Sequence, residues 1–247
     1  MPFVMNDGLR IHYVTIGDGA PLVLHHGTSF SGADWIDLGY VDPLKDGRQL
    51  ILIDSRGHGE SDKPHDPAAY LLSLRASDVT AVLDQLGHRQ ADFFGYSLGG
   101  WVGFGLAKYS PQRINSFVIG GANPNAETMQ FYRDWTINQK TFLAGIDRVV
   151  SNVRLPTSTI ARWRSNDVEA LHASSQDRES VNEALATMTM PCLFFAGELD
   201  PRIAPMKDCA SRLPNASFFA VPHGDHASTL FMCIDEIVPR VRAFLDR

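Results

Sequence analysis

The residues with the clearest chemical potential surround one serine. Ser97 lies in the stretch Gly95-Tyr96-Ser97-Leu98-Gly99, between an apolar run that ends at Tyr96 and another that begins at Leu98. A strand that turns directly into a helix exposes such a serine, and glycines two positions on either side relieve the crowding of the turn. The pattern predicts that Ser97 is a nucleophile and that the Leu98 N–H, at the helix start, points to where an oxyanion would form.

A serine hydroxyl is inert at neutral pH without a base and an acid that orients the base. Candidates for both occur downstream. Glu198 and Asp200 follow the apolar run 192–197, and His223 and His226 follow the run 217–221. These residues leave two candidate acids and two candidate bases.

Short apolar runs predict the eight strands that would position these residues. Several, such as 50–54 and 116–120, are uninterrupted apolar blocks, which is the pattern of strands covered on both faces of a parallel sheet. Only Gly-Asp-Gly-Ala-Pro separates the second strand from the third, too few residues for a crossover helix, so we expect an antiparallel start. The expected strands are 3–5, 10–16, 22–25, 50–54, 92–96, 116–120, 192–197 and 217–221.

Helical periodicity alternates with these strands, which predicts an α/β fold with a doubly wound, mostly parallel sheet flanked by helices. The expected helices are 71–86, 98–109, 203–213 and 231–245. The alternation stops between 125 and 188, where we expect several helices and no strand. We therefore expect a core of residues 1–124 and 189–247 and a helical lid, residues 125–188, inserted after the sixth strand; this segment is called the insert below.

The strand, the turn at Ser97 and the helix together resemble the nucleophile elbow of the α/β-hydrolase fold family, and the resemblance covers nearly the whole chain. It implies a triad in the chain order serine, acid, histidine. Asp200 is the preferred acid, because Glu198 is nearer the strand end and would have to turn back toward the base. His226 is the preferred base, since it matches the family's histidine just before a helix, whereas His223 fits a loop position.

The loop after the third strand, His25-His26-Gly27-Thr28-Ser29-Phe30, is expected to complete an oxyanion hole. In similar sequences the residue after a His-Gly pair donates its N–H, which implies Thr28, with Ser29 or Phe30 as alternatives if the loop is one step longer. No carboxylate is spaced to make the two histidines metal ligands, so we expect them to hold the loop. The resemblance likewise implies mainly structural roles for Arg56, His58 and Asp62 in the stretch 54–64.

Aromatic and aliphatic residues in the insert favour an apolar cover over Ser97 and a substrate with an apolar portion of modest size. Phe30 and Trp135 are the predicted substrate-binding residues. Arg133, Arg162 and Arg164 could meet a carboxylate, although such arginines are more often solvated. The other apolar residues of the insert considered are Met129, Phe131, Ile137, Phe142, Leu143, Ile146 and Trp163.

Fold alone does not choose among the reactions of the family. A serine at position 97 disfavours epoxide opening and dehalogenation, where similar enzymes carry an aspartate nucleophile. We expect hydrolysis of a small carboxylic ester, lactone or thioester through an acyl-enzyme. Carbon–carbon hydrolysis of a small diketone-type substrate is the alternative, although the oxyanion loop is not glycine-rich, and a ligand-binding receptor without turnover is a third interpretation.

Composition sets limits on partners. The 247 residues fit one large domain with an insertion, and a net charge of −6 without a basic run disfavours nucleic acid and anionic membranes. Three cysteines without a C-x-x-C pair disfavour a disulfide framework or zinc site and fit a reducing compartment. With neither a signal peptide nor a membrane span in the sequence, we expect a cytoplasmic protein with a small-molecule substrate, no cofactor and no metal. The oligomeric state does not follow from the sequence.

Overall fold

The computed structural model describes residues 2–247, so Met1 of the expected core lies outside the described residues. Its centre is an eight-stranded sheet with the order β1-β2-β4-β3-β5-β6-β7-β8. Every strand expected from the sequence is present, with ends shifted by two residues at most. The strands are β1 Phe3–Asn6, β2 Leu9–Ile16, β3 Ala20–His25, β4 Arg48–Ile53, β5 Ala91–Tyr96, β6 Ile114–Gly120, β7 Cys192–Gly197 and β8 Ala216–Val221.

The sheet begins antiparallel, as the short connection after β2 predicted. β1 pairs with β2, and β2 pairs with β4 rather than with its neighbour in sequence, β3. From β4 onward every pairing is parallel, so the carboxyl ends of β3, β5, β7 and β8 lie at one edge. The residues that follow these strands are therefore brought together.

Helices cover both faces of the sheet. Apolar residues of α3, α4 and α9 pack on one face, and those of α1, α2 and α11 pack on the other. The short α1 and α2 lie between β3 and β4 and were not expected. These helices are α1 Gly32–Asp37, α2 Val41–Leu44, α3 Leu72–Gln85, α4 Leu98–Tyr109, α9 Ile203–Ser211 and α11 Ile234–Leu245, with 3₁₀ turns η1 Pro67–Tyr70 and η2 Pro111–Arg113.

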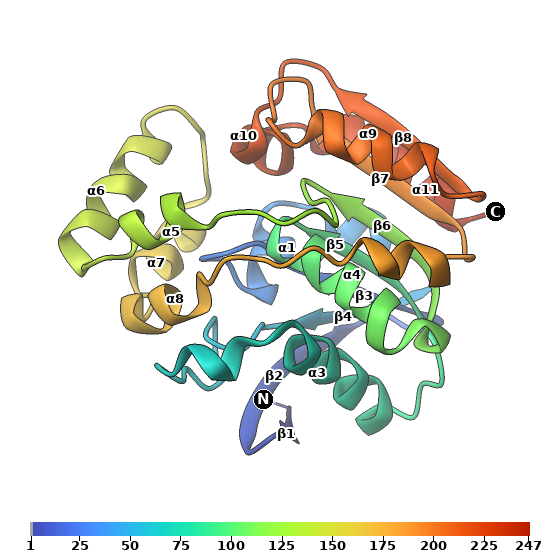
Figure 1. The fold of residues 1–247 in the computed structure, drawn as a ribbon, viewed down its shortest axis with the longest axis horizontal. Helices are drawn as coiled ribbons and strands as arrows, with labels where there is room; N and C mark the ends of the chain where they lie inside the picture. Colours follow the sequence, from blue (N-terminus) through green and yellow to red (C-terminus); the bar gives the residue numbers. More distant parts are fainter. Residues whose placement is uncertain (1) are drawn as a thin grey trace.

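The insert between β6 and β7 is helical, and Figure 1 shows its helices grouped beside the sheet, at the left of the view. A separate apolar cluster, which includes Phe142, Ile146 and Trp163, packs these helices on one another and on Phe30 of the core. The end of the insert instead packs with the core through Val181, Ala184 and Met188. The helices are α5 Gln130–Trp135, α6 Gln139–Val150, α7 Thr157–Arg164 and α8 Val168–Ser174, followed by the 3₁₀ turn η3 Asn182–Thr187.

The prediction of one continuous C-terminal helix over 231–245 is wrong. Cys233 leaves the helical region, with φ −113° and ψ 31°, and separates α10, His226–Met232, from α11. The two helices serve different surfaces: Leu230 and Phe231 of α10 line a cavity beside Ser97, whereas Ile237 and Val241 of α11 pack against the sheet. A single straight helix would not reach both.

Candidate active site

Ser97 lies at a strained turn between β5 and α4. Its φ of 55° and ψ of −108° are rare for a residue with a side chain, and its N–H is fixed by a 2.8 Å hydrogen bond to the Gly120 carbonyl oxygen. The flanking glycines are required by space: a Cβ at Gly95 would collide with the Gly99 carbonyl, and a Cβ at Gly99 would collide with that of His25. The two glycines therefore allow this turn to form against β3 and β6.

Ser97, His226 and Asp200 are connected by hydrogen bonds, although they come from three different connections of the sheet. The Ser97 Oγ lies 2.9 Å from the His226 Nε2, and the His226 Nδ1 lies 2.7 Å from the Asp200 Oδ2. Tyr96 supports the histidine, because its hydroxyl donates to the His226 carbonyl over 2.7 Å and its ring stacks on the imidazole. This arrangement lets His226 accept a proton from Ser97 while Asp200 orients it.

Asp200 remains a carboxylate in this position. Burial opposes its ionisation, but the hydrogen bond and the charge interaction with His226, together with Arg202, outweigh burial and lower the pKa of Asp200. The rival acid does not reach the imidazole: Glu198 is exposed and accepts a hydrogen bond from the His223 N–H over 3.1 Å. His223 lies in the exposed loop before α10.

The backbone N–H groups of Thr28 and Leu98, the predicted oxyanion donors, have no backbone acceptor among residues 2–247, and neither does that of Ser29, the first alternative to Thr28. The Phe30 N–H, an alternative donor, is instead occupied by the Gly27 carbonyl at 3.2 Å. His26 fixes this loop: its Nδ1 lies 2.7 Å from the Gly27 carbonyl oxygen, and its Nε2 accepts from the Ser55 N–H at 3.0 Å. These contacts are those of a residue that holds the loop.

A cavity of about 600 Å³ opens onto Ser97 and His226, and most of its wall is apolar. The two residues predicted to bind substrate, Phe30 and Trp135, both line it. Exposed apolar side chains, Phe131 and Leu199, lie at its edge. Its other lining residues include Thr28, Tyr132, Asp134, Arg148, Trp163, Asp225, Leu230 and Phe231.

The arginines considered in the insert do not line this cavity. Arg162 pairs with Asp34 and Asp37 of α1, Arg133 with Asp177, and Arg164 with Asp147. Arg148 is the arginine at the cavity wall.

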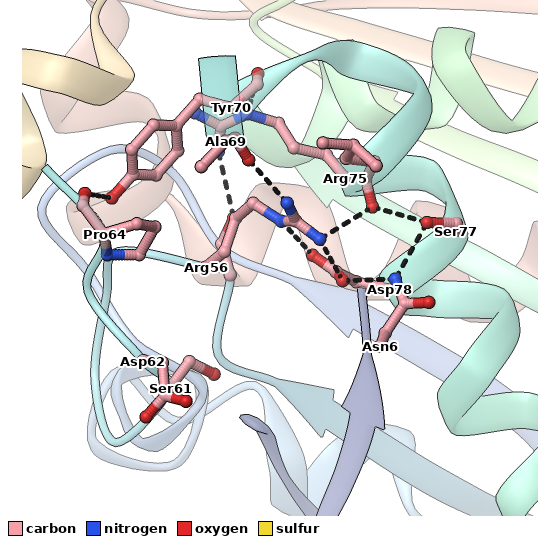
Figure 2. A network of polar contacts seen from close by, with 12 residues as sticks. Asn6, Arg56, Ser61, Asp62, Pro64, Ala69, Tyr70, Arg75, Ser77 and Asp78 are labelled. Carbon is pink, nitrogen blue, oxygen red and sulfur yellow. Dashed lines mark hydrogen bonds and ion pairs between the residues drawn. The ribbon is translucent and has the colours of Figure 1, made fainter. Parts of the chain in front are cut away.

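The polar residues after β4 build the structure beneath the site. Figure 2 shows the guanidinium of Arg56 beside the Asp78 carboxylate, at 2.7 Å, and it also donates to the carbonyl oxygens of Ala69 in η1 and Leu74 in α3. His58 is fully buried with its Nδ1 3.2 Å from the Arg56 carbonyl oxygen, and Asp62 pairs with Arg10. None of the three lines the cavity, so the described contacts are structural.

Sequence analysis missed Arg202, whose guanidinium lies 3.4 Å from the His226 Nδ1, and Glu127, which pairs with it. A charged residue two positions after the acid was the available signal for Arg202. Nothing in the sequence marked Glu127, because its partner lies 75 residues away.

Among the described residues, no group of three or more histidine, cysteine, aspartate or glutamate side chains could hold a metal ion. Within residues 2–247, none of the helices combines the length and apolar character needed to cross a bilayer.

Comparison with known proteins finds similarity over the whole chain. The family model described as the alpha/beta hydrolase fold matches residues 20–165. A pimeloyl-[acyl-carrier protein] methyl ester esterase of Vibrio parahaemolyticus is 26% identical, covering 95% of this chain and 98% of the relative. A soluble epoxide hydrolase of a Corynebacterium species is also 26% identical, covering 78% of this chain and 79% of the relative. The enol-lactonase of Burkholderia xenovorans has a similar structure, with a TM-score of 0.87 and 20% identity over 100% of both chains.

Proposed function

Because the chain belongs to the α/β-hydrolase fold family, we propose that it is a serine hydrolase that cleaves a small ester, lactone or thioester with an apolar acyl portion. The observation that carries the proposal is the chain of hydrogen bonds from Ser97 through His226 to Asp200 at the wall of an apolar cavity. The similarity to a methyl ester esterase supports the same reaction class. The epoxide hydrolase is equally identical over a smaller share of the chain, but a serine at position 97 does not suit its reaction.

In the proposed reaction, the Ser97 hydroxyl gives its proton to the His226 Nε2 as its oxygen attacks the substrate carbonyl. The N–H groups of Thr28 and Leu98 donate hydrogen bonds to the oxyanion of the tetrahedral intermediate. His226 then protonates the leaving oxygen or sulfur, and an acyl-enzyme remains on Ser97. Water, deprotonated by His226, attacks the acyl carbon; the bond to the Ser97 Oγ breaks, His226 returns its proton to that oxygen, and the acid leaves.

Asp200 keeps the proton of the imidazole on Nδ1, so that Nε2 is free to accept from Ser97. It also stabilises the imidazolium that forms in each half-reaction. The aromatic wall formed by Phe30, Trp135 and Trp163 would receive the apolar portion of the substrate.

The test is turnover of p-nitrophenyl esters from acetate to octanoate, of simple lactones and of acyl thioesters. Wild type is compared with Ser97→Ala and with Ser217→Ala, which removes an exposed serine on β8. We expect sustained turnover in wild type and Ser217→Ala, a chain-length optimum, and no turnover in Ser97→Ala. Release that stops after one equivalent favours a ligand-binding receptor, and inertness toward all three classes with cleavage of a diketone favours carbon–carbon hydrolysis; either result overturns the proposal.

A further inference from the structure

A buried cation lies beside the pair formed by Asp200 and His226. The Arg202 side chain is 14% exposed, and its Nη1 lies 3.9 Å from the Asp200 Oδ1 and 3.4 Å from the His226 Nδ1. The backbone N–H of Arg202 also donates to the Asp200 Oδ1 over 2.9 Å. A charge at this distance acts on the protonation of the imidazole.

The contact between Arg202 and His226 is unfavourable for the proposed reaction in two ways. A nearby cation disfavours the imidazolium that must form when Ser97 attacks. In addition, Arg202 could donate to an unprotonated Nδ1, which would leave the proton on Nε2 and stop that nitrogen from accepting the Ser97 proton. Arg202 therefore needs a partner that neutralises it and directs it away from Nδ1.

Glu127 is that partner. Its Oε1 contacts the Arg202 Nη2, and its Oε2 lies 3.3 Å from the Arg178 Nη1. Burial lowers the pKa of Arg202, but the charge and hydrogen bond of Glu127, together with Tyr132 and Asp200, outweigh burial and raise it. Glu127 is thus the largest single contribution that favours the charged form of Arg202.

Glu127 is itself fixed by the insert and by α4. Glu127 and Arg178, near the two ends of the insert, exchange backbone hydrogen bonds of 3.0 and 2.9 Å. The Arg178 guanidinium lies over the ring of Trp101 on α4, the helix that follows Ser97. The position of Glu127 thus depends on the ends of the insert.

Several ionisable groups lie around the His226 side chain. Asp200 and Arg202 contact its Nδ1, and the neighbouring Asp225 carboxylate caps α10 and interacts with its charge. Tyr96 stays neutral, because burial raises its pKa well above the usual range. Removal of the Glu127 charge would leave Asp200, which also binds His226, as the carboxylate paired with Arg202 in this set.

We propose that Glu127 is a positioning residue that acts through Arg202: it neutralises the guanidinium and keeps Asp200 as the partner of the His226 Nδ1. This inference rests on the proposed serine hydrolase function. It also couples the ends of the insert to the triad, since the same carboxylate binds Arg178.

The test compares Glu127→Gln, Arg202→Gln, the double variant and Glu198→Gln. Glu198→Gln is the matched control, because it removes an exposed carboxylate from the loop of Asp200 that does not contact Arg202. The pH dependence of kcat/KM is measured on the best ester. The pH dependence of Ser97 labelling by a fluorophosphonate is measured alongside, because labelling needs the same base but no turnover.

We expect Glu127→Gln to lower kcat by up to about tenfold with little change in KM, and to move the acidic limb of both profiles by about one pH unit to lower pH. Arg202→Gln should move the limb to higher pH, and the double variant should return it toward wild type. Glu198→Gln should leave both profiles unchanged.

A purely structural role would lower the Tm or raise KM without moving the acidic limb. If both single variants are folded by circular dichroism and their acidic limbs stay at the pH of the wild-type limb, the inference is overturned. Failure of the proposed function is distinguishable, because it shows as wild-type turnover that does not depend on Ser97, whatever the result at Glu127.

Discussion

Acidification below pH 6.5 should progressively destabilise this protein, because histidines that resist charging are buried beneath the loop of Thr28. Burial lowers the pKa of His25 to about 3 and holds that of His58 well below its usual range. Burial also lowers the pKa of His26, although Asp54 partly offsets the effect. In the unfolded chain, all three return to an ordinary value of about 6.5.

The pKa of each of these histidines is lower in the folded chain than in the unfolded chain. Since the folded pKa lies below the unfolded one, the unfolded chain binds more protons below pH 6.5, and acid favours unfolding. A histidine that stays neutral when folded contributes its full stability above pH 6.5 and loses about 1 kcal/mol of it between pH 6.5 and 5.5. His25 and His58 together should therefore cost about 2 kcal/mol over this interval, and His25 alone about 4 kcal/mol by pH 3.

The assay is urea denaturation at pH 7.5, 6.5 and 5.5, followed by circular dichroism, for wild type and His25→Gln. His223→Asn is the matched control, because His223 is exposed and asparagine tolerates its positive φ of 58°. His65 acts in the opposite direction, since its hydrogen bond with Asp167 raises its pKa, but it is exposed and solvent screens the interaction.

We expect the free energy of unfolding of wild type to fall by about 2 kcal/mol or more between pH 6.5 and 5.5. The fall should be about 1 kcal/mol smaller in His25→Gln and unchanged in His223→Asn. A wild-type stability that does not change over this interval, or an identical pH dependence in His25→Gln, would refute the reasoning.

Four substitutions test the surrounding structure. Gly99→Ala should prevent stable folding, because its Cβ has no space, as a lower Tm or loss of soluble protein would show. Arg56→Met should lower the free energy of unfolding, measured by urea denaturation, by about 3–5 kcal/mol, since it leaves the buried Asp78 carboxylate without its cation. Asp200→Asn should lower kcat by about 10³- to 10⁴-fold, far more than Glu198→Gln; the reverse order would assign the acid to Glu198. Phe30→Ala should move the chain-length optimum to longer p-nitrophenyl esters, and an unchanged optimum would place the acyl group elsewhere.

The features that the sequence predicted are those with local causes. An uninterrupted apolar block such as 192–197 forms a strand wherever it is covered on both faces, and all eight strands could be located in this way. The position of the turn at Ser97 could be predicted as well, because Gly95 and Gly99 mark it in the sequence, although the space that Gly99 leaves open is needed by His25 of β3. The apolar character of the insert also predicted an apolar cavity wall.

Other features depend on residues that are far apart in the chain, and the sequence did not specify them. The pairing of β2 with β4, and the break at Cys233 that lets α10 reach the cavity, both depend on packing against other elements. The family resemblance led to a preference for Asp200 and His226, but the hydrogen bond between them, which Glu198 does not make, depends on how two loops meet.

The pair formed by Glu127 and Arg202 is the clearest example, since only the fold brings the start of the insert against the loop of the acid. The sequence by itself determined the strands and the place of the nucleophile, because the apolar blocks and the glycines around Ser97 are patterns of a few residues. The tertiary structure decided which charges face His226, because the interaction between charges depends on their separation in space.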